Sequence, residues 1–116
     1  MDDADWNFTE QQAETVYTCE QLRDTKGVKP HTPVMLDLFF IPIEGEEARR
    51  EAFEKALTSF GYELGEADSD APEQVAVSAG EIPFTPQDIW LHEERTTKMA
   101  LARGYKPDGW GFAEPV

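Results

Sequence analysis

The side chains that most often bind transition metals or act as nucleophiles, histidine and cysteine, are few and scattered in this sequence. Neither His31 nor His92 has a second His or Cys at the spacing that zinc sites use. His92 begins a His-Glu pair like that of zinc-protease helices, but Thr96 stands where the second His is needed. Cys19 precedes Glu20, whose charge disfavours a reactive thiolate. We therefore expect neither a metal site nor a nucleophilic enzyme.

Carboxylate pairs, which could serve in general acid–base catalysis, arise by chance among 24 acidic residues. Glu93 and Glu94 would point in different directions on a helix, and we expect both to be solvated. The chain has no Gly-rich phosphate loop and no Gly-x-Ser-x-Gly elbow. The sequence therefore predicts a protein that is not an enzyme and has no cofactor.

Acidity is the strongest feature of the composition, because 24 Asp and Glu against 10 Lys and Arg give a formal net charge of -14. This charge repels phosphate backbones and anionic membranes over a Debye length of about 10 Å. We expect no direct nucleic-acid binding and no membrane binding. The charge favours a protein partner with a basic segment, although it could also serve solubility alone.

Three features predict a cytoplasmic location. The single cysteine, Cys19, cannot close an intrachain disulfide, which fits a reducing compartment. The N-terminus, Met1 to Asp5, is acidic and lacks the positive charge and apolar run of a secretory signal. The longest apolar run, Val34 to Ile43, is far shorter than the roughly 20 residues that span a membrane.

Two sequence features are candidate partner-binding sites. The first is an acidic zone without Lys or Arg, expected near a hairpin tip, and it comprises Glu63, Glu66, Asp68, Asp70 and Glu73. It could dock a basic segment or could be a solvated loop. The second is Asp108-Gly-Trp-Gly111, where Asp108 and Gly109 favour a turn. Trp110 could be an exposed interface anchor or could pack on a helix.

These candidates depend on the elements that hold them, and the first element is an N-terminal helix. Asn7 or Thr9 can cap its start, and Gly27 ends it. Its expected apolar stripe consists of Ala13, Val16, Tyr17 and Leu22. Two further helices are predicted, one from Glu46 to Phe60 and one from the Thr85 cap to about Arg103.

The strands complete the predicted fold. Val34 to Ile41 is almost continuously apolar and reads as a central strand covered on both faces, with Asp37 at an edge or bulge. Tyr62 to Glu66 and Gln74 to Ala79 form a hairpin, and a last strand follows Pro107. The order is a helix and then β-α-β-β-α-β. We therefore predict an α+β protein: residues 1–30 form a helix and extended connection, residues 31–116 form a ferredoxin-like sandwich, and both belong to one structural unit.

The segment Tyr105-Lys-Pro-Asp-Gly-Trp-Gly-Phe112 resembles one in the regulator of ribonuclease E activity B family, small acidic inhibitors of that endoribonuclease. The element order and Phe60-Gly-Tyr-Glu63 also agree, so the resemblance covers about Phe8 to Glu114. The resemblance implies a protein that is not an enzyme and that binds the non-catalytic region of ribonuclease E. Pro107 replaces the aromatic residue expected there, and the chain lacks the long acidic tail of some members.

The sequence also leaves open a second function, different from that of a regulator of RNA decay. The chain could be a small ferredoxin-like enzyme or ligand-binding domain, as a monomer or as a dimer formed through its sheet. A deep apolar pocket with convergent polar groups would favour this alternative. The sequence is compatible with a monomer or a dimer, because either edge strand could be exposed or paired.

Overall fold

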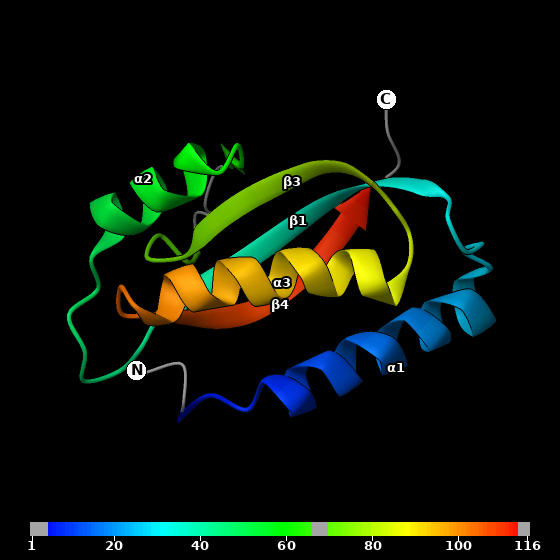
Figure 1. The fold of residues 1–116 in the computed structure, drawn as a ribbon, viewed down its shortest axis with the longest axis horizontal. Coiled ribbons are helices and arrows are strands. Elements are labelled where there is room, and N and C mark those ends of the chain that lie inside the picture. Colours follow the sequence, from blue (N-terminus) through cyan, green and yellow to red (C-terminus); the bar gives the residue numbers. More distant parts are fainter. Residues whose placement is uncertain (1–4, 66–69, 114–116) are drawn as a thin grey trace.

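The described part of the chain forms one four-stranded sheet, with three helices that pack on it or on each other (Figure 1). The computed structural model describes residues 5–65 and 70–113. The elements in chain order are α1 (Phe8–Lys26), β1 (Pro33–Pro42), α2 (Arg50–Ser59), β2 (Glu63–Leu64), β3 (Val75–Pro83), α3 (Pro86–Leu101) and β4 (Tyr105–Ala113). The predicted α+β class is confirmed. No helix in the described ranges is both long and apolar enough to cross a membrane.

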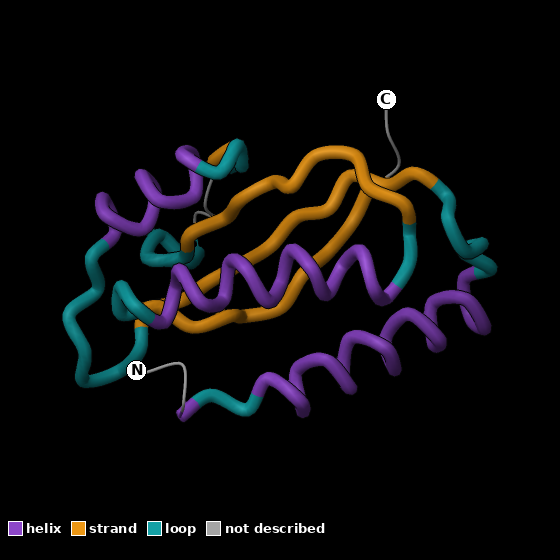
Figure 2. Tube along the Cα trace, viewed as in Figure 1, coloured by secondary structure: helices purple, strands orange, loops and turns teal. Residues whose placement is uncertain are grey.

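The strands lie in the order β2-β3-β1-β4, and every neighbouring pair is antiparallel. Leu38 at the centre of β1 is opposite Val77 of β3 and Trp110 of β4. The strands form one layer, and α3 crosses in front of it (Figure 2). α2 and α3 pack against the same face, where Phe53 of α2 lies between the rings of Phe40 and Tyr105, with both centroid distances 5.1 Å.

The prediction that β1 is covered on both faces is wrong. Burial alternates along this strand: Val34, Leu36, Leu38 and Phe40 are buried against the helices. Met35, Asp37 and Phe39 lie between them on the other face and are partly exposed. Asp37 is not on an edge strand, but it does lie at a register shift between β1 and β3, as the bulge prediction required.

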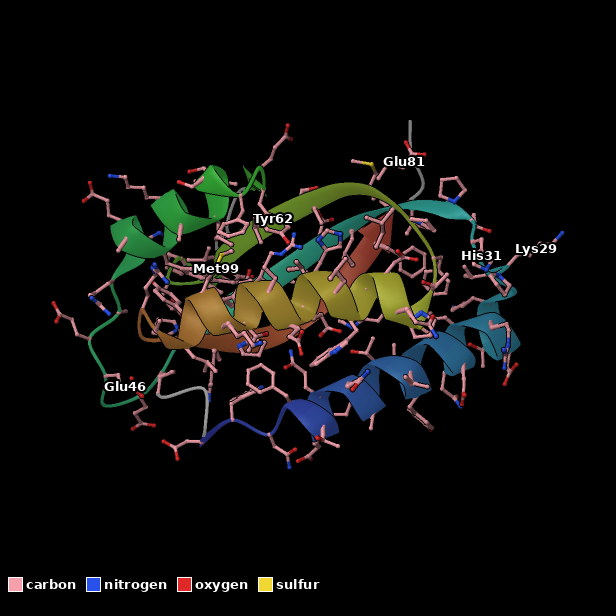
Figure 3. All side chains as sticks on the ribbon, viewed as in Figure 1. Lys29, His31, Glu46, Tyr62, Glu81 and Met99 are labelled. Carbon is pink, nitrogen blue, oxygen red and sulfur yellow. The ribbon has the colours of Figure 1, made fainter. Side chains whose placement is uncertain are left out.

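Helix α2 begins at Arg50, four residues after the predicted start at Glu46. The preceding segment is hydrogen-bonded to the turn between α3 and β4, and only its last residue, Arg49, also accepts from α2, through Phe53 N–H at 3.0 Å. Ile43 N–H donates to Gly104 O at 2.9 Å, and Arg49 N–H donates to Arg103 O at 3.0 Å. Glu46 therefore lies in a loop before α2 (Figure 3) and not in its first turn.

The start and end of α1 agree with the prediction, but the buried face does not. Asn7 Oδ1 accepts from Glu10 N–H at 3.0 Å, and Gly27 ends the helix in the left-handed region. The predicted apolar stripe, however, is mostly exposed: Ala13, Val16 and Tyr17 all face solvent. The buried residues are Gln11, Thr15 and Cys19. These side chains face α3, which α1 lies alongside in Figure 1.

Candidate functional site: a cleft between the first helix and the last strand

The predicted acidic zone is only partly visible in the structure. Glu63, Asp70 and Glu73 are exposed, whereas Glu66 and Asp68 lie outside the described residues. A cation also reaches this loop from α2. The Arg50 guanidinium donates to Pro72 O at 3.0 Å and to Gln74 O at 3.3 Å. The loop of the zone thus has a guanidinium beside it, although the ion pair of Arg50 is with Glu54 of α2, at 3.7 Å.

Trp110 combines features of both interpretations of the Asp-Gly-Trp-Gly segment. One part of its side chain packs on the hydrophobic core, with its ring centroid 6.5 Å from that of Phe112. It also lines a cavity of about 490 Å³ between α1 and β4. Asp108 is exposed and does not line this cavity, and Gly109 has a φ of +105° in the turn beside it.

The cavity between α1 and β4, which we call the α1–β4 cleft, contains three carboxylates and two indoles. Its lining residues are Trp6, Asn7, Glu10, Gln11, Glu14, Thr15, Thr18, Glu93, Pro107, Gly109 and Trp110. None of these described lining residues is Lys, Arg or His. The cleft therefore places negative charge beside aromatic surface, and none of its described lining residues is a cation.

Glu93 of α3 is the most buried carboxylate of the cleft, with only 6% of its surface exposed. The prediction that it is solvated is wrong. Thr15 Oγ1 donates to Glu93 Oε1, and Gln11 Nε2 donates to Glu93 Oε2 at 3.4 Å and to Thr97 Oγ1 at 3.1 Å. Trp6 Nε1 in turn donates to Gln11 Oε1 at 3.0 Å, which fixes the orientation of that amide.

Burial changes the proton affinity of two groups at this contact between α1 and α3. It raises the pKa of Glu93 to about 7; the hydrogen bonds from Thr15 and Gln11 oppose this shift, and the charge of Glu14 adds to it. Burial, with smaller effects of Glu93 and Glu20, raises the pKa of Cys19 to about 11. Cys19 is thus a buried thiol and is poorly suited to act as a nucleophile.

A second polar cluster joins the start of β2 to α3. The Tyr62 hydroxyl lies 2.9 Å from His92 Nδ1 and accepts from Arg95 at 3.4 Å. Tyr62 is buried beside α3 (Figure 3), and the Arg95 guanidinium lies 5.8 Å from the Phe60 ring centroid. Burial lowers the pKa of His92. In the described ranges no group of three or more His, Cys, Asp or Glu residues could hold a metal ion.

Sequence reasoning identified one wall of the cleft, Trp110, but missed Trp6, Glu10, Glu14 and Glu93. The available signal was the polar series Gln11, Thr15 and Cys19, whose spacing of four residues places it on one helix face. The sequence of this chain matches no protein-family model and no curated protein.

Proposed function

We propose that this protein is a non-enzymatic, protein-binding regulator, similar to the inhibitors of ribonuclease E, that acts in the cytoplasm. It would bind a basic segment of that nuclease or of another protein and so modulate RNA decay. The observation that carries the proposal is the α1–β4 cleft, where Trp110 of the Asp-Gly-Trp-Gly segment lies with three carboxylates. A partly buried tryptophan in an acidic recess is suited to anchor a cationic partner.

The sheet supports the finer fold assignment that this proposal includes. In a ferredoxin-like β-α-β-β-α-β unit the first and third strands are central, and here β1 and β3 occupy the centre of the sheet. We therefore propose a ferredoxin-like sandwich extended by α1. The packing of Gln11 and Thr15 against Glu93 and Thr97 favours one structural unit.

The proposed mechanism is competition between an acidic protein surface and RNA for the same cationic segment. A net charge of -14 accelerates the encounter with an Arg-rich segment and makes it sensitive to salt. The regulator needs no active site, because occupation of the segment changes which RNA and proteins assemble on the nuclease.

The test is a pull-down from a native lysate with tagged full-length protein, followed by titration of the purified protein with the basic, non-catalytic region of ribonuclease E. We expect recovery of the nuclease and an affinity that falls at least about tenfold between about 50 mM and about 500 mM salt. Affinity that is independent of salt would remove electrostatics from the mechanism. Absence of binding at low salt would contradict ribonuclease E as the partner.

One observation favours the alternative of a monomeric or dimeric ligand-binding domain or small enzyme. The cleft volume of about 490 Å³ falls within the roughly 300–1,000 Å³ of small-molecule pockets. Its lining, however, is rich in carboxylates, whereas such pockets are predominantly apolar. A small molecule retained by the purified protein, with no protein recovered in the pull-down, would support this alternative.

A further inference from the structure

The carboxylates of the α1–β4 cleft have hydrogen-bonding capacity that the described chain does not use. Glu93 accepts one bond at each oxygen, although a carboxylate can accept about four in all. Glu10 accepts from Asn7 Nδ2 at 3.3 Å. No side-chain hydrogen bond or ion pair of the Glu14 carboxylate is present among the described residues. Acceptors for a ligand with several N–H donors are therefore available in the cleft.

The two indoles make the cleft selective for a particular kind of cation. Trp is the side chain that binds cations best over its ring face, and a planar guanidinium can stack on it as well. Trp6 and Trp110 both line the cavity, which also contains Glu93 at 6% exposure. A guanidinium offers five donors in a fixed fork, which suits bidentate bonds to carboxylates. An ammonium group lacks both the plane and the fork.

We propose that the α1–β4 cleft receives an arginine side chain of the partner's basic segment, which stacks on Trp110 and pairs with Glu14 and Glu93. This assignment rests on the function proposed above and narrows it to one site and one side chain. It also moves the expected contact away from the β2–β3 loop. There Arg50 already supplies a guanidinium, whereas the lining of the cleft contains none.

The proposal has a second readout in the pH dependence of binding. A cation favours ionised Glu93, so affinity should rise as pH increases from about 6 to about 8. From α1, the titratable groups near Glu93 are Glu14 and Cys19, together with the neutral Gln11. The cleft residues of β4 are Pro107, Gly109 and Trp110, which do not titrate.

The direct test titrates the full chain with a peptide of Arg-Gly-Gly repeats and follows tryptophan fluorescence. The matched peptide carries citrulline, a neutral isostere, at every arginine. Glu14→Gln should weaken binding of the arginine peptide about three- to tenfold. Glu51→Gln removes the same charge from an exposed position on α2 and should weaken it less than about twofold. The citrulline peptide should not bind.

A second pair of variants tests the aromatic wall. Trp110→Leu should weaken the arginine peptide about tenfold, whereas Trp110→Phe should retain most of the affinity. Thermal melts are recorded for both variants, because Trp110 also packs on the core. If Trp110→Leu does not fold, the comparison of Glu14→Gln with Glu51→Gln tests the cleft without it. Glu14 is exposed, so its substitution should not prevent folding.

The outcomes separate this inference from the proposed function. Equal effects of Glu14→Gln and Glu51→Gln, or equal binding of the citrulline peptide, would overturn the cleft assignment. If the nuclease region still bound wild type in that case, the regulator function would stand and its site would lie elsewhere. Binding of the arginine peptide in the cleft without binding of the nuclease would instead support the site and refute the named partner.

Discussion

Gly104→Ala is expected to lower the free energy of unfolding by about 3–5 kcal/mol, the largest effect expected of a Gly→Ala substitution in this chain. Gly104 is buried and has a φ of +82°, a conformation that side chains with a Cβ rarely adopt. A Cβ there would overlap Glu47 O and lie 2.9 Å from Glu47 C. Removing this overlap requires movement of the loop before α2, which is hydrogen-bonded to this turn through Ile43 N–H and Arg49 N–H.

Gly61→Ala is the matched control for the backbone conformation. Gly61 has a φ of +88°, but a Cβ there would meet no atom within 4 Å. The Gly61→Ala variant should therefore lose only the free energy that the left-handed backbone conformation costs a residue with a Cβ, about 1–2 kcal/mol. Urea denaturation of the two variants measures the difference. Equal destabilisation would mean that the contact between Gly104 and Glu47 does not constrain the loop before α2.

Glu93→Gln is expected to stabilise the protein at about pH 8, by on the order of 2 kcal/mol. Burial raises the folded-state pKa of Glu93 from 4.5 to about 7. Below pH 4.5 the carboxyl is protonated in both states and has no linkage penalty. Between 4.5 and about 7 the folded state binds more protons, so stability falls as pH rises, and above about 7 the penalty is constant. A neutral glutamine avoids this loss.

The glutamine keeps an oxygen to accept from Thr15, but its amide nitrogen meets the Gln11 amide nitrogen, which offsets part of the gain. Glu94→Gln removes one charge from the next, half-exposed position and is the matched control. The measurement is the free energy of unfolding from about pH 4 to about pH 8 for all three proteins. An unchanged slope in Glu93→Gln would show that this carboxylate is solvated after all.

Features set by neighbouring residues were predictable from the sequence. The Thr85 side chain accepts from Asp88 N–H at 3.0 Å and caps α3, and Pro86 occupies its first turn, as expected. Asn7 caps α1, and Gly27 ends it. The α+β class also followed from the alternation of strand and helix patterns.

Features set by distant partners were not predictable. The start of α2 depends on hydrogen bonds to Arg103 and Gly104, which no local pattern reveals. The buried face of α1 is polar because Thr15 pairs with Glu93, 78 positions away. Apolar periodicity therefore selected the wrong face of this helix. The same pairing hides the buried carboxylate, so sequence reasoning found Trp110 in the site but not the acidic side chains beside it.

The most direct test of the central claim, that the α1–β4 cleft binds a basic segment, is a map of backbone amide NMR shifts. Labelled full-length protein is titrated with the basic, non-catalytic region of ribonuclease E. We expect the largest shifts in residues 6–18 of α1 and its cap and in residues 107–111 of β4. Shifts confined to the β2–β3 loop or to the partly exposed face of β1, with none at the cleft, would contradict the account.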